Sequence, residues 1–233
     1  MNYVFDVDGT LTPSREKIDA EFHDYFLNFC KENPTYLVTG SDYPKTLEQL
    51  GEDICRAVLG VFSCSGNMLI MKGEEVYRND FELSDDERIA LKNELYASGF
   101  PIRTGNHIEE RIGTANFSIV GRNANRAERQ QYVMWDNNSN ERLEICKRLN
   151  AAFPRLECVV GGETSIDIFL KGRDKAQIVN HIGRPFTFFG DRCEVGGNDH
   201  SIYKIADTAY YVEGWEHTYS ILQILKWSYY DGR

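Results

Sequence analysis

Two aspartates at the end of the first apolar segment are the strongest chemical signal in this chain. Asp6 and Asp8 follow the apolar run at residues 3–5, and a Gly-Thr pair turns the chain directly afterwards. Because side chains alternate along a strand, both carboxylates point to the same side at the strand tip. Like charges this close are unfavourable unless a cation or a shared proton relieves them. The pair indicates a reactive or metal-binding carboxylate centre, although an ordinary acidic turn has the same sequence.

Further polar side chains follow later strand-like segments, in the order hydroxyl, ammonium and carboxylate. They are Ser41, Lys175, Asp191 and Asp199. Each one alone has a structural explanation as a helix cap, a solvated helix start or an acidic surface turn. Together with the first two aspartates, they supply what phosphoryl transfer to a carboxylate requires: a nucleophile, an acid/base, groups that hold phosphoryl oxygens, and ligands for Mg²⁺.

The elements that must position these residues alternate between strands and helices. Strand-like apolar runs lie at residues 3–5, 36–38, 57–64, 186–189 and 209–212, and helical spacing occurs at 16–30, 44–50, 174–182, 201–206 and 217–227. The polar side chains fall at the carboxyl ends of strands, which is where open α/β sheets bind ligands. We therefore predict an α/β core with a parallel sheet, formed by residues 1–81 and 173–233.

Residues 82–172 interrupt this alternation. A capping-box pattern, Ser84 to Glu87, opens a predicted helix that ends near residue 98. Two strands, a second helix and two more strands follow at residues 108–111, 115–120, 141–153, 156–160 and 165–170. This order predicts an α+β module that is inserted into the core as a cap.

The inserted module concentrates positive charge in an acidic chain. Residues 101–130 contain five arginines and three glutamates, a net charge of +2, whereas the whole chain has a formal net charge of −10. Guanidinium groups bind phosphate through paired hydrogen bonds. Three of the arginines are candidates for a phosphate clamp distant from the aspartate pair: Arg111, Arg122 and Arg129. A solvated basic face is the alternative interpretation.

The composition excludes several functional classes. The acidic net charge gives no general affinity for nucleic-acid backbones or anionic lipid. No apolar run approaches the about 18 residues that a membrane span needs, and the first residues do not resemble a secretory signal. The six cysteines include no CxxC pair, so free thiols in a reducing compartment are favoured over a zinc site. We expect a cytoplasmic protein with a small-molecule substrate and with no nucleic-acid or membrane partner.

The ordered polar motifs resemble the four motifs of the haloacid dehalogenase (HAD) superfamily. Longer strings narrow the resemblance to eukaryotic-type α-phosphomannomutases, and they cover nearly the whole chain. These strings are DVDGTLTPSR, TGSDYPKTLEQLG, ERIGTANFSIVGR, AERQQY, GGETSIDIFLKGRDK and FFGDRCEVGGNDHSIY. Three of them lie in the insert, where sequences of this superfamily diverge fastest, so the match there bears on the substrate class.

The resemblance implies a HAD-like Rossmannoid core with a cap, and a magnesium-dependent phosphomutase activity on mannose or glucose phosphates. It implies that Asp6 is the nucleophile that forms an aspartyl phosphate and that Asp8 is the acid/base, with Ser41 and Lys175 beside the phosphoryl group. It implies Mg²⁺ ligands as well: Asp6, the main-chain carbonyl of Asp8, Asp191 and Asp199. A hexose 1,6-bisphosphate is the activator that such a mutase needs.

The resemblance also implies which residues of this chain contact the substrate. They are Arg15, Arg111, Asn116, Arg122, Arg129, Ser165 and Asp167. Two other insert arginines, Arg103 and Arg126, match no family role, and we expect them at the surface. The chain departs from the family pattern at residues 112, 114, 115, 119 and 120, which favours a shifted substrate preference.

Family members commonly pair through their caps, so the resemblance implies a homodimer of that kind. The main alternative function is a sugar phosphatase that shares every core residue but uses water to cleave the aspartyl phosphate. A binding module without catalysis is disfavoured because Asp6 is present. A distal phosphate clamp favours the mutase, since its substrate carries a phosphate at both ends during the cycle.

Overall fold

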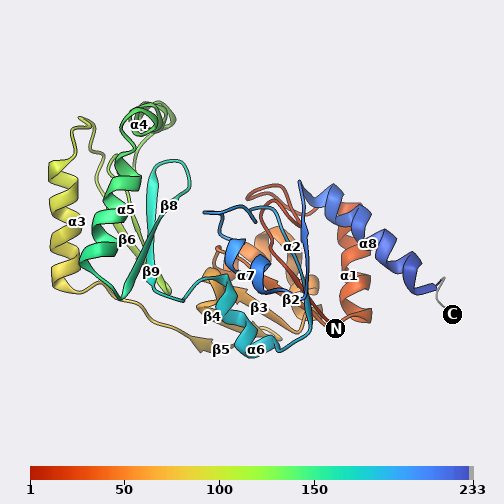
Figure 1. Ribbon diagram of the computed structural model, residues 1–233. Coiled ribbons are helices and arrows are strands. Elements are labelled where there is room, and N and C mark those ends of the chain that lie inside the picture. Colours follow the sequence, from red (N-terminus) through yellow and green to blue (C-terminus); the bar gives the residue numbers. More distant parts are fainter. Residues whose placement is uncertain (231–233) are drawn as a thin grey trace. The chain divides into compact units, whose positions relative to one another are not determined.

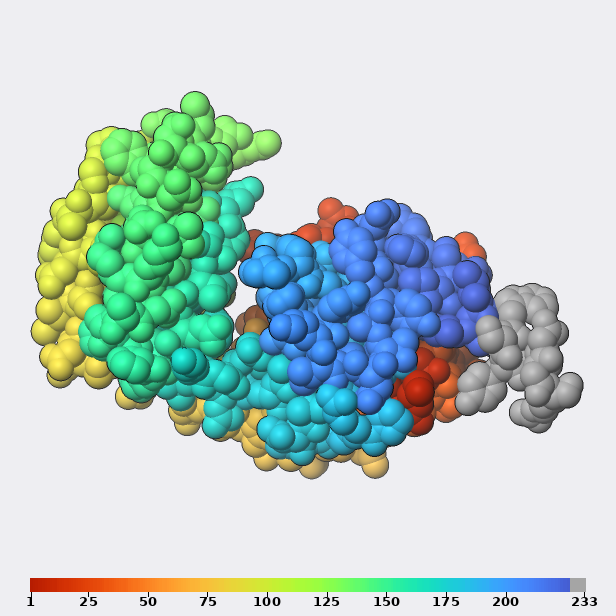
Figure 2. Space-filling view, in the orientation of Figure 1, coloured from red at the N-terminus to blue at the C-terminus, as the bar shows by residue number. Residues whose placement is uncertain are grey.

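The chain forms two compact units in a computed structural model, which describes residues 1–230 and, for side chains, residues 1–226. The core unit contains Met1–Arg78 together with the segment that begins at Asp174, and the cap unit contains Asn79–Arg173 (Figure 1). The borders lie at 78/79 and 173/174, where the sequence predicted 81/82 and 172/173. The cap unit is the part drawn from yellow to turquoise in the space-filling view (Figure 2).

The core unit is built on a seven-stranded sheet with the order β11-β10-β1-β2-β3-β4-β5. Five of these strands are parallel: β1 (Asn2–Phe5), β2 (Thr35–Val38), β3 (Gly60–Ser63), β10 (Phe186–Gly190) and β11 (Thr208–Tyr211). The first strand of the chain lies inside the sheet, between β2 and β10. The predicted α/β class with a parallel core sheet is confirmed.

Helices cover both faces of this sheet, which explains why its strands are short apolar runs without alternation. On β1, Val4 and Phe5 point to opposite faces and join different buried clusters. The Phe5 face packs against α1 (Ala20–Glu32), α2 (Tyr43–Ala57) and α8 (Trp215–Tyr230). The Val4 face packs against a short 3₁₀ segment (Lys175–Ile178), α6 (Val179–Ile182) and α7 (His200–Ile205).

Two predictions for the core were wrong in their boundaries. Helix α2 does not end near residue 50: it breaks at Gly51, where φ is 84°, and resumes to Ala57, so β3 begins at Gly60 rather than near residue 57. The sheet also has an antiparallel edge hairpin, β4 (Met68–Met71) and β5 (Glu74–Arg78), that was not predicted. The edge strand β5 is largely exposed and charged, so its sequence lacks the apolar alternation that marks a half-buried strand.

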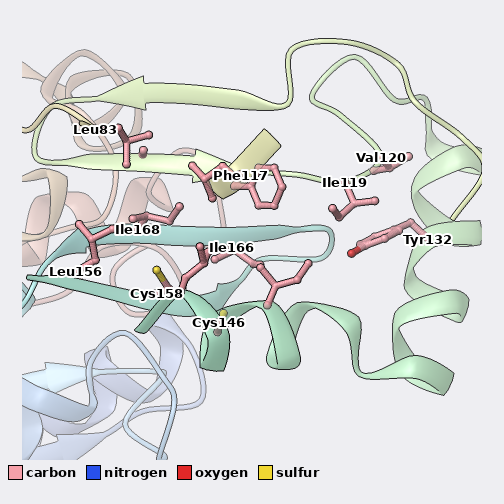
Figure 3. Packing of buried hydrophobic residues seen from close by; sticks show 14 of the residues in the cluster. Leu83, Phe117, Ile119, Val120, Tyr132, Cys146, Leu156, Cys158, Ile166 and Ile168 are labelled. Carbon is pink, nitrogen blue, oxygen red and sulfur yellow. The ribbon is translucent and has the colours of Figure 1, made fainter. Parts of the chain in front are cut away.

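The cap unit packs three helices on one face of a four-stranded antiparallel sheet. The strand order is β6 (Ile108–Arg111), β7 (Thr114–Phe117), β9 (Ser165–Leu170) and β8 (Leu156–Gly161), and the helices are α3 (Asp85–Ala97), α4 (Arg126–Ser139) and α5 (Glu141–Ala152). The predicted capping box of Ser84 and Glu87 is present at the start of α3. Figure 3 shows Phe117, Ile166 and Ile168 of the sheet packed in this cluster with Tyr132 of α4.

Helix α4 was missed, so the predicted order of one helix between β7 and β8 is wrong. Only Tyr132 and Asp136 of this helix are buried, and its sequence therefore has no apolar stripe of helical period. The signal that was present is polar: Asn125 and Glu128 form a second capping box. Helix α4 carries Arg129, which is one of the predicted phosphate contacts.

Arg103 was expected at the surface, and the structure shows it half-buried, with its guanidinium bound to backbone carbonyl oxygens. Its guanidinium donates to the carbonyl oxygens of Leu95 and Ser98, each at 3.1 Å, in the last turn of α3 and just beyond it. A side-chain cation at this position satisfies carbonyls that the helix leaves without intrahelical donors. Arg126, by contrast, is exposed as expected.

The composition also led to expectations about the six cysteines and about membrane-spanning helices. All six cysteines are buried. Among the residues that the structure describes, no helix combines the length and the apolar content that crossing a bilayer requires.

Glu87 connects the start of α3 to a residue far along the chain. Its side chain accepts hydrogen bonds from the Ser84 amide at 2.8 Å and from Arg155 Nε at 2.6 Å. Burial opposes ionisation of this carboxyl, but Arg155 and Ser84 outweigh burial and lower the pKa of Glu87 below its ordinary value of 4.5. A carboxyl with a lowered pKa stabilises the fold above its ordinary pKa and loses this contribution as the pH falls through the lowered value.

We expect Arg155→Met to destabilise the cap unit at about pH 7 by about 1–2 kcal/mol, because it leaves the nearly buried Glu87 carboxylate without its cation. The difference from the wild type should shrink below about pH 4, as Glu87 becomes protonated. Hydrogen exchange of the α3 amides at about pH 7 and below about pH 4 measures this difference in stability between the variant and the wild type. Lys147→Met is the matched control, because the Lys147–Glu144 pair is exposed. A loss that is the same at both pH values contradicts the prediction.

Candidate active site

Asp6 lies directly after β1 and is paired with a buried lysine. Asp6 is 3% exposed, and its backbone amide donates to the carbonyl of Phe189 on the neighbouring β10 at 2.9 Å. Lys175, which is 0% exposed, places its Nζ atom 2.5 Å from Asp6 Oδ1 and 2.7 Å from Asp199 Oδ1. A single ammonium group therefore connects two buried carboxylates that are 193 positions apart in the chain.

Three carboxylates gather around this ammonium. Asp6, Asp191 and Asp199 each offer an oxygen atom, and these atoms all lie within 4.8 Å of one another. Asp191 follows β10, and Asp199 immediately precedes α7. The close approach depends on Gly9, because a Cβ atom there would lie 2.2 Å from Asp191 Oδ2, and its φ of 81° favours glycine.

The electrostatics of this cluster oppose full ionisation. Burial raises the pKa of Asp6 to about 8, although the Lys175 ammonium counteracts it, and Asp199 and Asp191 add repulsion. Burial likewise raises the pKa of Asp191 to about 6, with a further contribution from Asp199. For Lys175, burial disfavours the ammonium, but Asp199 and Asp6 outweigh burial and raise its pKa. The cluster holds more negative charge than its one cation can balance.

This surplus of buried negative charge fits a divalent metal ion. Carboxylate oxygens are the ligands that Mg²⁺ prefers, and Mg²⁺ is commonly held by one or two carboxylates plus phosphate oxygens. The three carboxylates converge, two of them are almost fully buried, and one ammonium leaves them under-compensated. The residues present therefore suit Mg²⁺ in both chemistry and charge.

Asp8 lies two residues beyond Asp6 but has a separate set of partners. Its Oδ2 atom accepts the Ser41 hydroxyl at 3.2 Å, and its Oδ1 atom accepts the backbone amide of Arg15 at 2.6 Å and Nε2 of Gln49 at 3.0 Å. The side chain of Arg15 is exposed, and its φ of 64° is uncommon for a residue other than glycine. The structure thus places Ser41 and the Arg15 backbone against Asp8.

One face of the cap sheet brings together the predicted sugar contacts. Asn116 and Asp167 are paired across β7 and β9, and Asn116 Nδ2 donates to Asp167 Oδ1 at 2.7 Å. Ser165 lies two residues before Asp167 and hence on the same face, with its hydroxyl on the Gly161 carbonyl at 3.2 Å. In the described part of the chain, the buried Oδ1 atom of Asn116 has no hydrogen-bond partner.

Two of the predicted phosphate contacts are held together by a glutamate. Glu109 Oε2 accepts hydrogen bonds from Arg111 Nη2 and from Arg122 Nε, both at 2.8 Å. These contacts, with Arg111 foremost, lower the pKa of Glu109. Arg129 joins the same cluster, because its Nη2 atom donates to the backbone carbonyl of Arg122 at 3.3 Å. The three arginines thus form one group on the cap unit.

Two residues of this site were missed from the sequence, Gln49 and Glu109. A glutamine within a helix and a glutamate within a basic segment have no distinguishing pattern. Strand pairing across β6 and β7 places Glu109 opposite Asn116, but that register is a product of the fold. The six predicted residues of the core, Asp6, Asp8, Ser41, Lys175, Asp191 and Asp199, form the two adjoining groups described above.

A family comparison matches most of the chain. The family model described as eukaryotic phosphomannomutase covers residues 22–228. This chain belongs to that family. The phosphomannomutase of Saccharomyces cerevisiae is 32% identical and aligns over 86% of this chain and 84% of its own length. A probable phosphomannomutase of Caenorhabditis elegans is 35% identical, with 92% of this chain and 91% of that protein aligned.

Solved structures show the same fold at low sequence identity. A HAD subclass IIB sugar phosphatase has a TM-score of 0.55 and 19% identity, with 89% of this chain and 85% of that chain covered. The IMP-nucleotidase of Plasmodium falciparum has a TM-score of 0.66 and 14% identity over 95% of this chain and 67% of that chain. This chain therefore has a HAD-like fold. Its assignment to the phosphomannomutase family rests on the sequence matches and not on these structures.

Proposed function

We propose that this enzyme interconverts mannose 6-phosphate and mannose 1-phosphate by passing a phosphoryl group through Asp6. The buried Asp6 carboxylate, held at the tip of the central strand by Lys175, is the observation that carries the proposal. Membership of the phosphomannomutase family supports the choice of substrate. Glucose phosphates, which differ from mannose phosphates in the configuration of one hydroxyl group, are the nearest alternative substrates.

In the first half reaction, a carboxylate oxygen of Asp6 attacks the phosphorus atom of a bound hexose bisphosphate. The phosphorus–oxygen bond to the sugar breaks, and Asp8 gives its proton to the departing sugar oxygen. The monophosphate formed leaves, and a monophosphate of the other isomer binds and presents its free C6 or C1 hydroxyl to the aspartyl phosphate. Asp8 takes the proton of that hydroxyl as its oxygen attacks the aspartyl phosphate, which restores Asp6 and releases the bisphosphate. A hexose 1,6-bisphosphate is therefore the activator that loads the enzyme.

Three carboxylates and one carbonyl of the core unit would hold Mg²⁺: those of Asp6, Asp191 and Asp199, and the main-chain oxygen of Asp8. The ion supplies positive charge against the transferring phosphoryl oxygens. Lys175 adds a fixed ammonium against Asp6 and Asp199, and the Ser41 hydroxyl is close enough to Asp8 to donate to a phosphoryl oxygen beside it.

The cap unit would bind the rest of the substrate. Guanidinium groups of Arg111, Arg122 and Arg129 suit the distal phosphate, because each can make two parallel hydrogen bonds to it. The unpartnered Oδ1 atom of Asn116 can accept from a sugar hydroxyl, with Asp167 and Ser165 on the same face of the sheet. We also propose a cytoplasmic homodimer that pairs through the cap units, as is common in this family.

The mutase and a sugar phosphatase are separated by their products. The enzyme is incubated with Mg²⁺, mannose 1-phosphate and a catalytic amount of hexose 1,6-bisphosphate, and both mannose 6-phosphate and free phosphate are measured. We expect mannose 6-phosphate to form in excess of free phosphate. Free phosphate without mannose 6-phosphate contradicts the mutase and favours the phosphatase.

Arg129→Ala tests the distal phosphate clamp. The substitution removes a charge-assisted contact worth about 1.5–3 kcal/mol, so mutase flux should fall by about ten- to a hundredfold. Hydrolysis of acetyl phosphate uses only the core site and should change little. Arg126→Ala is the matched control, because Arg126 is exposed on the same helix. A parallel loss of both activities, or of neither, contradicts the clamp.

A further inference from the structure

Gln49 is a buried polar side chain in direct contact with Asp8. It lies in α2 and is 2% exposed. Its Nε2 atom donates to Asp8 Oδ1 at 3.0 Å and to Thr12 Oγ1 at 3.1 Å. Its Oε1 atom is buried and, among the residues described, has no hydrogen-bond partner. The amide nitrogen therefore has two hydrogen-bond acceptors, whereas the amide oxygen has no donor among the residues described.

The unsatisfied Oε1 atom of Gln49 shows that the side-chain amide is oriented by the hydrogen bonds of its nitrogen and not by those of its oxygen. A buried acceptor without a donor is unfavourable, and such groups are rare in folded proteins. Rotating the amide by half a turn would not help, because Oε1 would then face the Asp8 carboxylate, acceptor against acceptor. A methionine at position 49 would fill the same space with no unsatisfied atom. The unsatisfied oxygen offsets what the Nε2 hydrogen bonds contribute to stability, so the donor to Asp8 is the feature of the glutamine that a methionine could not replace.

The backbone on either side holds Gln49 in place. The Gln49 carbonyl accepts the amide of Ile18 at 2.9 Å, which ties this turn of the helix to the segment that follows the Asp8 turn. Helix α2 breaks two residues later, at Gly51. The side chain thus extends from the end of a helical segment whose position is fixed, which is the arrangement that precise placement of a reacting group needs.

We propose that Gln49 is a positioning residue for phosphoryl transfer, which fixes the Asp8 carboxylate so that its Oδ2 atom exchanges the proton with the substrate. The Oδ1 atom of Asp8 accepts two hydrogen bonds, one from the side-chain amide of Gln49 and one from the backbone amide of Arg15. Oδ2 accepts only the Ser41 hydroxyl among the described residues, and that hydroxyl can turn to a phosphoryl oxygen instead. This inference rests on the proposed function of Asp8, and it adds which oxygen reacts and what holds the carboxylate.

The test uses two phosphoryl donors that differ in their need for an acid. A sugar alkoxide must be protonated as it departs, whereas dinitrophenolate leaves without a proton. Single-turnover formation of the phosphoenzyme is measured with hexose 1,6-bisphosphate and with 2,4-dinitrophenyl phosphate. For Gln49→Met we expect the rate with the sugar phosphate to fall by about tenfold or more, which is part of the about 10²–10⁴-fold that general acid catalysis supplies. With dinitrophenyl phosphate we expect the rate to stay within about twofold of the wild type.

Two further variants control this comparison. Thr46→Val changes a buried hydroxyl one turn earlier on α2, where it donates to the Asp42 carbonyl at 3.0 Å and makes no described contact with Asp8. Neither of its rates should change. Asp8→Asn should show the same selective loss as Gln49→Met, but a larger one. Thermal unfolding of Gln49→Met should occur close to the wild-type temperature, because the loss of the donor to Asp8 and Thr12 is offset by the removal of an unsatisfied buried oxygen.

Each outcome decides the inference. If Asp8→Asn is selective but Gln49→Met changes neither rate, or both rates equally, then Gln49 does not position Asp8 and the inference is wrong while the proposed function stands. If Asp8→Asn slows both donors equally or slows neither, then the acid/base role of Asp8 fails and the inference fails with it. A selective loss in both variants, with a stable Gln49→Met protein, supports both.

Discussion

Asp6→Asn is expected to lower phosphoryl transfer from sugar phosphates by about 10³-fold or more while leaving the fold intact. The amide cannot attack phosphorus, and it is also a poorer ligand for Mg²⁺, whereas its volume matches that of the carboxyl. Phosphoenzyme trapping with labelled hexose bisphosphate measures the loss directly. Turnover at a tenth of the wild-type rate contradicts the assignment of Asp6 as the nucleophile.

The same variant should be more stable than the wild type in the absence of Mg²⁺. The pKa of Asp6 is raised from 3.8 to about 8, chiefly by burial, so the folded state binds this proton more tightly than the unfolded state does. Stability from this group is therefore present at low pH and is lost as the pH rises from about 4 to about 8. The uncharged amide of the variant avoids that loss. Thermal unfolding should show the advantage near neutral pH and its disappearance at about pH 4.

Lys175→Met is expected to have the largest effect on stability. The substitution leaves Asp6 and Asp199 facing each other without the ammonium that joins them, and removing one partner of a buried ion pair typically costs about 3–5 kcal/mol. Activity should be lost as well. Because the chain forms two compact units, hydrogen exchange of the β1 amides is the measurement that reports on the core unit by itself.

A control and a rescue separate this effect from a loss of lysine in general. Lys204→Met, at an exposed position of α7, should change stability by no more than about 0.5 kcal/mol. Adding Asp199→Asn to Lys175→Met should recover part of the stability, because one of the two opposed carboxylates is removed, but it should not recover activity. A Lys175→Met protein as stable as the wild type would show that the carboxylates do not depend on this cation.

The expected gain in stability for Asp6→Asn and the expected loss for Lys175→Met have the same cause: the site is electrostatically unfavourable without its ligands. Three carboxylates share one ammonium, and burial raises the pKa of two of them. Binding sites of this kind reduce stability in favour of function. Mg²⁺ should therefore raise the unfolding temperature of the wild type more than that of Asp6→Asn, since a ligand stabilises the state that binds it.

The sequence by itself determined the class of fold and the chemistry of the core site. Short apolar runs that end in polar side chains predict parallel strands with a site at their carboxyl ends, because a strand buried on both faces has no polar alternation. Asp6, Asp8, Ser41, Lys175 and the acidic loop after β10 were recognisable because phosphoryl transfer needs those groups and because their order along the chain resembles that of the HAD motifs. Local patterns also predicted the capping box at α3, which depends on residues only three positions apart.

Only the tertiary structure decided which groups act together. Lys175 lies between Asp6 and Asp199 because β10 pairs with β1, and strand order is not encoded in any local segment. Helix α4 and the edge strand β5 were missed because they bury too few side chains to show a period. Gln49 and Glu109 were missed for another reason: each acquires its role from a partner on a different element, and a buried contact between distant residues is a property of packing rather than of spacing.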